Sequence, residues 1–253
     1  MSGNDAPIAY RAEQAVATIT LDDPKRRNAL STGLIAEFRK ALARAVADPG
    51  IRVVVIDHAG PVFCAGGDLK ESAAATRAED LPAVHLAELL AEVCESPKPV
   101  VAVVRGAARG GGIGLIAAAD VAICSDEAEM AFSEVRLGVV PAVIGPVVAR
   151  RLGPARMRQL FLTGYQFTGA DAEEWGLVDF ATYELDEALE ETVSELLAGG
   201  PAAQAGIKVL TATSDLRDRL QDEAARTAAF FLSSEGQEGV RSFIEKRHPS
   251  WVG

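Results

Sequence analysis

The sequence predicts an α/β fold with parallel strands, and three observations support this class. Up to about residue 145, strand-like segments alternate with amphipathic helical segments. Two of the strand-like segments, residues 52–57 and 99–104, are almost entirely apolar, which is typical of strands that helices cover on both faces. Hydrophobic residues make up 49% of the 253 positions, so the chain can bury a large core.

The first elements follow from periodicity and from capping residues. Residues 16–21 alternate and are rich in β-branched side chains, which predicts a strand. Ser31 is a candidate N-cap for an amphipathic helix that ends near residues 48–50. The segments after this helix continue the alternation: strand 52–57, loop 59–67, a helix from Asp68, helix 81–94, strand 99–104, helix 112–119 and strand 121–124.

The pattern becomes helical after about residue 145. Thr168 and Asp171 have the spacing of a capping box, and so do Ser234 and Gln237. The expected helices are 146–152, 155–163, 169–175 and an almost continuous stretch over 184–247, broken at 199–201 and 233–234. We therefore expect an α/β core over residues 1–190 and a helical region over residues 191–253.

Composition and charge restrict the possible partners. The net charge of −11 and the pI near 4.8 argue against nucleic acid as the main partner, because phosphate backbones would be repelled. Apolar runs are too short to cross a membrane. The three cysteines include no C-x-x-C pair, and the three histidines lack metal-ligand spacing, so neither disulfides nor a metal site is expected. The expected compartment is a reducing cytoplasm.

The glycine-rich segment 106–114 joins a predicted buried strand to a helix. Backbone N–H groups at such a helix start favour an anion or a developing oxyanion. Close strand–helix packing is an alternative reason for the glycines. Dinucleotide binding is another, since residues 112–117 match G-x-G-x-x-A, although this match lies inside the predicted helix.

A second glycine loop and an isolated glutamate complete the candidate site. Gly66 and Gly67 precede Asp68, a potential helix cap, so this loop could aim a second N–H group into the same crevice. Glu134 lies in a mostly apolar stretch, where a carboxyl can exchange protons near neutral pH. The alternative for Glu134 is a surface ion pair with Arg136 or Arg150. Cys64 is expected to be a small apolar side chain, and His58 a solvated loop residue.

In combination, these motifs resemble those of the crotonase superfamily, the enoyl-CoA hydratases and isomerases. The similarity extends from about residue 8 to residue 251 and is carried by residues 28–30, 65–69, 110–112, 119–120, 133–138 and 168–178. Residues 133–141 also resemble the branch that acts on 3-methylglutaconyl-type thioesters.

The resemblance implies a spiral of ββα units with a helical C-terminal region that mediates trimers or dimers of trimers. It also implies an acyl-CoA thioester as substrate, with no cofactor besides the CoA of the substrate, and oxyanion donors at the N–H groups of Gly67 and Gly111. Substrate-binding positions by the same resemblance are Arg27, Ala29, Ala65, Asp68, Leu69, Gly112 and Pro141. A solvated loop is the alternative for the basic residues 25–27.

One position departs from the two-glutamate pattern of many family hydratases. Glu134 matches one of the two glutamates, but Gly114 stands where the other would be. Our first expectation is an enoyl-CoA hydratase, a lyase in which Glu134 positions water and passes a proton to C2. The alternatives are a Δ3-Δ2-enoyl-CoA isomerase that uses Glu134 alone, and a catalytically silent acyl-CoA-binding or scaffold protein. Arg109 could meet a substrate carboxylate, or form a surface salt bridge.

Overall fold

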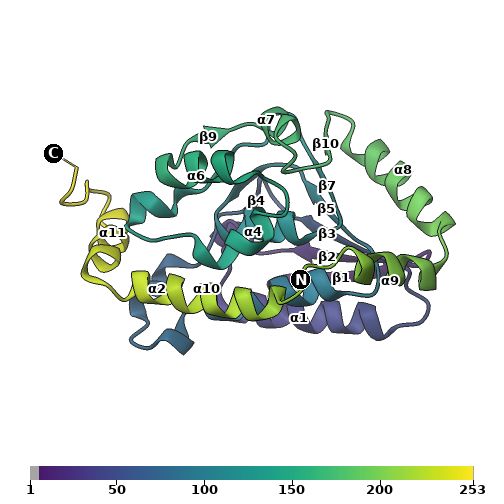
Figure 1. The fold of residues 1–253 in the computed structure, drawn as a ribbon, viewed down its shortest axis with the longest axis horizontal. Coiled ribbons are helices and arrows are strands. Elements are labelled where there is room, and N and C mark those ends of the chain that lie inside the picture. Colours follow the sequence, from purple (N-terminus) through teal and green to yellow (C-terminus); the bar gives the residue numbers. More distant parts are fainter. Residues whose placement is uncertain (1–5, 253) are drawn as a thin grey trace, which may run out of the picture.

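Two mixed sheets and a set of C-terminal helices form the structure, a computed structural model that describes residues 6–252 (Figure 1). The larger sheet has the order β1 (Ile8–Glu13), β2 (Val16–Leu21), β3 (Val53–His58), β5 (Val100–Val104), β7 (Val121–Cys124), β10 (Phe180–Ala181). The smaller sheet has the order β4 (Val62–Cys64), β6 (Ala107–Arg109), β8 (Met130–Ala131), β9 (Gln166–Phe167). Neighbouring strands are parallel, except the antiparallel pairs β1–β2 and β8–β9.

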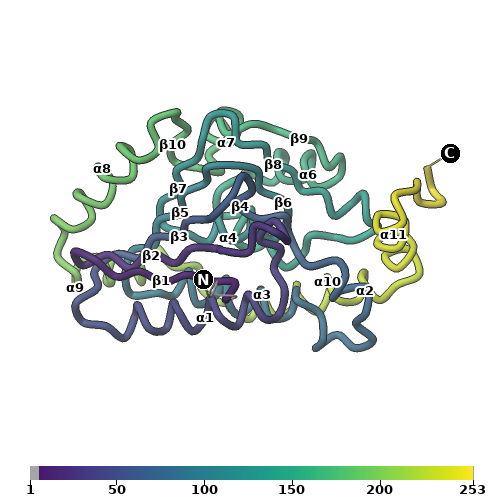
Figure 2. The backbone as a smooth tube through the Cα atoms, turned by 180° about the vertical axis from the view of Figure 1, so that it is seen from behind, coloured from purple at the N-terminus to yellow at the C-terminus, as the bar shows by residue number. Residues whose placement is uncertain are grey.

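Alternate residues of the central strands pack on opposite faces of the larger sheet. Val54 and Ile56 belong to the main core, beside α1 (Thr32–Ala47) and α3 (Pro82–Glu95). On the other face, Val53, Val55, Val101, Val103 and Ile123 pack against α8 (Leu185–Ala198). Figure 2 shows α1 and α3 along one side of the sheet and α8 on the other. The prediction of parallel strands buried on both faces is confirmed.

The remaining helices agree with most of the predicted ranges. They are α2 (Leu69–Ala74), α4 (Gly111–Ala118), α5 (Gly145–Val148), α6 (Pro154–Thr163), α7 (Gly169–Glu174), α9 (Pro201–Leu210), α10 (Leu216–Phe231) and α11 (Ser234–Ile244). Predicted breaks at 199–201 and 233–234 are confirmed, but a further break at 211–215 was missed. The expected division between residues 190 and 191 falls inside α8. Within residues 6–252, every helix is too short or too polar to cross a bilayer.

The helix caps test the sequence interpretation residue by residue. Ser31 Oγ accepts from the Leu34 N–H at 3.1 Å, as predicted. Thr168 and Asp171 form the predicted capping box. The second capping box, Ser234 with Gln237, was wrong: Ser233 is the N-cap, and its Oγ accepts from the Gly236 N–H at 3.1 Å. The helix therefore begins at Ser234, one residue earlier than a cap at Ser234 would require.

Three successive chain segments repeat one pattern, which positions the site. In each, a strand of the larger sheet is followed by a strand of the smaller sheet and then by a helical segment: β3-β4-α2, β5-β6-α4, and β7-β8 with the 3-10 helix η3 (Ser133–Leu137). Because β4, β6 and β8 are adjacent and parallel, their carboxyl ends lie at one edge of the smaller sheet. The three loops that follow these strands therefore meet.

A buried asparagine holds the loop after β2 beside the loop after β3. Asn28 is fully buried and has φ +53°, a backbone conformation that asparagine tolerates better than most residues. Its Oδ1 accepts from the Asp23 N–H at 2.8 Å. Its Nδ2 donates to the carbonyl oxygens of Ala59 at 3.1 Å and Val62 at 2.8 Å. One side chain thus satisfies three backbone groups and joins the two loops.

We predict that Asn28→Ala lowers the free energy of unfolding by about 2–4 kcal/mol, because it leaves buried backbone groups without partners. Urea unfolding at a fixed protein concentration measures the effect. The matched control is Lys25→Ala, an exposed substitution in the same loop, which should change stability by at most about 0.5 kcal/mol. Equal stability of the two variants would contradict this role for Asn28.

Candidate functional site

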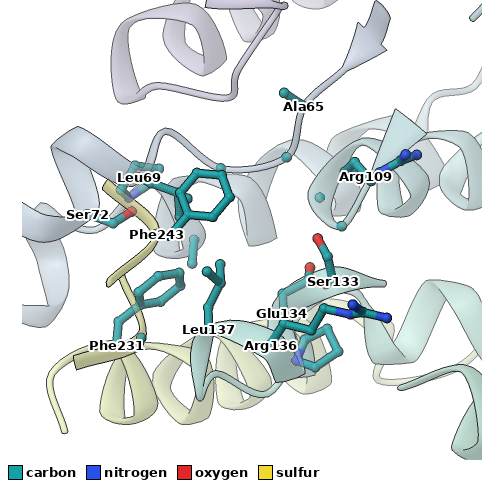
Figure 3. A pocket seen from close by; sticks show the side chains of 18 of the residues that line it. Ala65, Leu69, Ser72, Arg109, Ser133, Glu134, Arg136, Leu137, Phe231 and Phe243 are labelled. Carbon is teal, nitrogen blue, oxygen red and sulfur yellow. The ribbon is translucent and has the colours of Figure 1, made fainter. Parts of the chain in front are cut away.

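A cavity of about 440 Å³ lies where the loops after β4, β6 and β8 meet the C-terminal helices. Gly67 comes from the first loop, Gly111 from the second and Glu134 from the third, and all three line the cavity. The sequence predicted two glycine loops facing one crevice, and the structure brings both together with the glutamate. Figure 3 shows Glu134 and Ser133 beneath the strand end that carries Ala65.

The N–H groups of Gly67 and Gly111 have the environment of hydrogen-bond donors to a ligand. Gly67 pairs with Leu30 as an isolated parallel bridge, in which Gly66 O and Asp68 N make the hydrogen bonds to Leu30. Gly111 is the first residue of α4, so its N–H lies outside the intrahelical ladder. Among the hydrogen bonds of residues 6–252, neither N–H has an acceptor. Two such donors at one cavity suit an oxygen that gains negative charge.

Close packing disfavours a side chain at two positions of the second loop. A Cβ atom on Gly111 would lie 3.0 Å from Leu30 Cδ1 and 3.0 Å from Leu86 Cδ2. A Cβ atom on Gly110 would lie 2.2 Å from Glu134 Oε1, and the φ of Gly110 is +45°. The Glu134 carboxyl therefore occupies the space that a side chain at Gly110 would need. Both readings of the glycine segment, close packing and exposed N–H groups, apply to it.

Glu134 is half-buried as a residue, its Oε2 is enclosed, and its carboxyl forms no ion pair within residues 6–252. Its Oε2 has no hydrogen-bond partner. Burial raises the pKa of Glu134 from 4.5 to about 7, opposed only by a hydrogen bond from its own backbone. The alternative of a surface ion pair is wrong, since Arg136 donates to Gly164 O and Arg150 donates to Cys94 Sγ. Such a carboxyl can accept and return protons near neutral pH.

The position expected for a second glutamate is closed by packing. Gly114 lies in the buried helix α4, and a Cβ atom there would lie 2.3 Å from Ile144 Cγ2 and 2.9 Å from Ile144 Cβ. Ile144 is itself fully buried. Among the described residues 6–252, Glu134 is the only carboxyl that lines the cavity.

The predicted substrate-binding residues divide into two groups. Arg27, Ala65, Leu69 and Pro141 line the cavity, as predicted positions for a ligand should. The other three, Ala29, Asp68 and Gly112, do not line it. Asp68 caps α2 through the N–H groups of Lys70 and Glu71. Gly112 packs on Cys64, whose Cβ would lie 2.6 Å from an added Cβ.

Two residues near the loops have roles that differ from or refine the expectations. His58 was expected to be solvated, which is wrong: it is buried, and its Nε2 accepts from the Arg105 N–H at 3.0 Å. Burial lowers the pKa of His58. Cys64 is a buried thiol whose pKa burial raises to about 12, consistent with the predicted apolar role.

The sequence suggested that residues 70–90 and the helical C-terminus contribute to the wall of the pocket, and α3, α10 and α11 do supply part of it. Leu86, Phe231 and Phe243 line the cavity from these helices. Their apolar periodicity predicted helices, but not which side chains would reach residues more than a hundred positions away. Within residues 6–252, no group of three or more histidine, cysteine, aspartate or glutamate side chains is placed to hold a metal ion.

Comparisons with known proteins identify the family to which the chain is similar. A family model described as Enoyl-CoA hydratase/isomerase matches residues 11–253. Carnitinyl-CoA dehydratase of Proteus mirabilis is 34% identical, over 94% of this chain and 95% of that protein. Trans-2-decenoyl-(acyl-carrier-protein) isomerase of Streptococcus mutans is 30% identical, over 97% of this chain and 98% of that protein.

The solved structures confirm the predicted fold. An enoyl-CoA hydratase from Mycobacterium avium superposes with a TM-score of 0.89 at 37% identity, covering 98% of this chain and 100% of that chain. The α/β crotonase fold, with its two mixed sheets and its C-terminal helices, is therefore the fold of this protein. The sequence match and the structural match together show that the chain belongs to the enoyl-CoA hydratase/isomerase family.

Proposed function

We propose that this protein is an enzyme that moves a proton on unsaturated acyl-CoA thioesters, with Glu134 as its single acid–base group. The observation that carries the proposal is that, in the part of the chain that the structure describes, Glu134 is the only carboxyl lining the cavity that Gly67 and Gly111 also line. The two glycine N–H groups would hold the thioester oxygen. Loss of one such donor typically raises a reaction barrier by about 3 kcal/mol, so the pair can supply much of the acceleration.

This geometry supports Δ3-Δ2 isomerisation best. In that reaction the Glu134 carboxylate removes a proton from C2 of a 3-enoyl thioester, and the electrons move onto the thioester oxygen. The N–H groups of Gly67 and Gly111 stabilise this dienolate. Glu134 then returns the proton to C4, which leaves the 2,3-double bond. One carboxyl performs both transfers, and no water has to be held.

Hydration of the 2,3-double bond is the second candidate, and it was the first expectation from the sequence. The names of relatives favour it, since a hydratase and a dehydratase are among them. In this reaction Glu134 would have to position the water that attacks C3 and also pass a proton to C2. Ile144 fills the space where another carboxyl could share these tasks.

The charges around the cavity support a CoA thioester as ligand. Of the four arginines that line the cavity, Arg109 pairs with Glu129 and Arg247 pairs with Glu238 and Glu245, whereas Arg27 and Arg136 form no ion pair within residues 6–252. A local excess of positive charge attracts an anionic ligand. In the basic run 25–27, Arg26 pairs with Asp23 and Arg27 lines the cavity. We assign the CoA phosphates to the part of the cavity that Arg27 lines.

We also propose a cytoplasmic homotrimer or dimer of trimers. The helical stretch over residues 200–250 is rich in apolar residues, which suggested association, but Leu216, Leu220 and Phe231 pack into their own chain. The remaining ones stay exposed, as do apolar neighbours on α9: Ile207, Val209, Leu210, Phe230, Leu232, Phe243 and Ile244. An apolar surface of this kind supports association between copies.

We predict that Glu134→Gln lowers kcat by at least about a hundredfold, because the amide cannot carry the proton. Binding of a saturated acyl-CoA should change little. Turnover is followed by enoyl absorbance with 3-hexenoyl-CoA for isomerisation and crotonyl-CoA for hydration. The control is Glu129→Gln, an exposed carboxyl paired with Arg109. Wild-type turnover by Glu134→Gln on every substrate that the enzyme accepts would exclude a catalytic role, and no turnover by the wild type would favour the silent-binding alternative.

We predict that kcat/KM rises with pH through an apparent pKa of about 7, since Glu134 must be ionised to act as a base. The stability effect has the opposite sign. The folded state holds this proton more tightly than the unfolded state, so the contribution of Glu134 to stability falls as pH rises from about 4.5 to about 7. The difference in Tm between Glu134→Gln and the wild type should therefore be more favourable to the variant at pH 8 than at pH 5. A pH-independent difference in Tm would contradict the raised pKa.

We predict that Gly114→Glu alone lowers Tm sharply or prevents folding, because its side chain meets Ile144 and buries a charge. The double variant Gly114→Glu/Ile144→Ala has room for the carboxyl. It should hydrate crotonyl-CoA at least about tenfold faster than the control Ile144→Ala. No gain in hydration by a folded double variant would show that water activation is not what the wild type lacks.

A further inference from the structure

One end of the cavity is apolar and lies to one side of Glu134. Figure 3 shows Leu69, Leu137, Phe231 and Phe243 gathered on this side, with Arg109 on the other. Pro82, Ala83, Leu86 and Val143 add further apolar lining. We refer to the side chains of Leu69, Leu137, Phe231 and Phe243 as the apolar end.

The hydroxyl groups near the apolar end are already engaged within the protein. Ser72 Oγ donates to Asp68 O at 2.8 Å, and Ser242 Oγ donates to Gly239 O at 2.8 Å. Thr227 Oγ1 accepts from the Val143 N–H at 2.9 Å and donates to Val140 O at 3.3 Å. These hydroxyls therefore have no proton left to donate to a polar group on a ligand.

The arginines of the cavity are engaged or lie toward another side. Arg109 donates to Glu129 O and lies within 3.5 Å of Glu129 Oε2, so it forms the surface salt bridge that was one of its two expected roles. Arg247 binds Glu238 through two nitrogens, at 2.6 and 2.9 Å, and Glu245 at 2.6 Å.

The other two arginines lie away from the apolar end. Arg136 donates to Gly164 O at 3.3 Å and points away from Leu137 in Figure 3. The Arg27 carbonyl oxygen accepts from the Ala65 N–H at 3.0 Å, so Arg27 lies beside the end of β4. A carboxylate placed among the apolar side chains would thus be buried without a counter-charge, which is strongly unfavourable.

We propose that the apolar end binds the acyl chain and selects an uncharged, hydrocarbon chain over a carboxylated one, with Phe231 as the wall that limits its length. This deepens the proposed function and rests on it. Phe231 is 8% exposed and packs with Leu81, Val139, Ala228 and Val240, so its ring is held from behind. Phe243 is 62% exposed and lies at the open rim. The 3-methylglutaconyl group, which ends in a carboxylate, does not suit this site.

Calorimetric binding of saturated acyl-CoAs tests the selection without any turnover. Pentanoyl-CoA and glutaryl-CoA have the same number of acyl carbons, and at pH 7 they differ by the terminal carboxylate. We expect glutaryl-CoA to bind the wild-type protein at least about tenfold more weakly, and affinity to increase from butyryl-CoA upward until the chain meets Phe231. Equal or tighter binding of glutaryl-CoA would overturn the proposal, and so would binding of none of these thioesters.

Phe231→Leu tests the wall, because leucine keeps the site apolar while shortening the side chain. The length at which affinity stops increasing should rise, with a gain of about tenfold for the first chain that the wild type rejects. The control is Phe230→Leu, the exposed neighbour that does not line the cavity. An unchanged length preference in a folded Phe231→Leu protein would overturn the role of Phe231, and if this variant does not fold, the wild-type pair pentanoyl-CoA and glutaryl-CoA still decides the selection.

The two proposals fail in different ways. If the protein binds hydrocarbon chains selectively but converts neither 3-hexenoyl-CoA nor crotonyl-CoA, the proposed reaction is wrong and the acyl-chain site stands. If it converts an enoyl-CoA but binds glutaryl-CoA as well as pentanoyl-CoA, the reaction stands and the selection is wrong.

Discussion

The parallel pairing of three very short strands is the constraint on which the candidate site depends. β4, β6 and β8 contribute only a few hydrogen bonds each, yet their carboxyl ends lie side by side. The loop after each strand carries one group of the site, Gly67, Gly111 or Glu134. The larger sheet makes this possible because its strands β3, β5 and β7 precede the short strands in the chain and are themselves parallel neighbours. A change of order in either sheet would separate the three groups.

The packing around Glu134 has two effects: it raises the pKa of the carboxyl, and it lowers the stability of the folded protein when that carboxyl is ionised. Gly110 provides the space for the carboxyl, and within residues 6–252 no side chain pairs with its Oε2. The raised pKa makes the carboxyl an effective proton carrier near neutral pH, but an ionised, unpartnered carboxylate disfavours the folded state. Asn28 and the cap of α2 supply stabilising hydrogen bonds in the loops beside Glu134. These hydrogen bonds hold the loops in position even though an ionised Glu134 carboxylate without a counter-charge is unfavourable.

The sequence predicted the central strands, most helices and the three groups of the site, because these depend on local signals. Strand 121–124 was predicted at its observed bounds, since its residues are apolar and β-branched and follow a helix end. The short strands β4, β6 and β8 were missed because two or three residues carry no periodicity. β1 was missed because its turn, at Gln14 and Ala15, reaches positive φ without a glycine or asparagine signal.

What the sequence could not show is which distant side chains complete the cavity. Phe230 and Phe231 are adjacent and chemically identical, but only Phe231 lines the cavity, because α10 turns that side inward against α3 and the loop at Val139. The same helix leaves Phe230 toward solvent. Under the proposal for the acyl-chain site, specificity depends on the rotation of α10 relative to the loops after β4, β6 and β8. Relatives can share the loops after β4, β6 and β8, and hence a reaction type, while differing in the acyl group that such a helix admits.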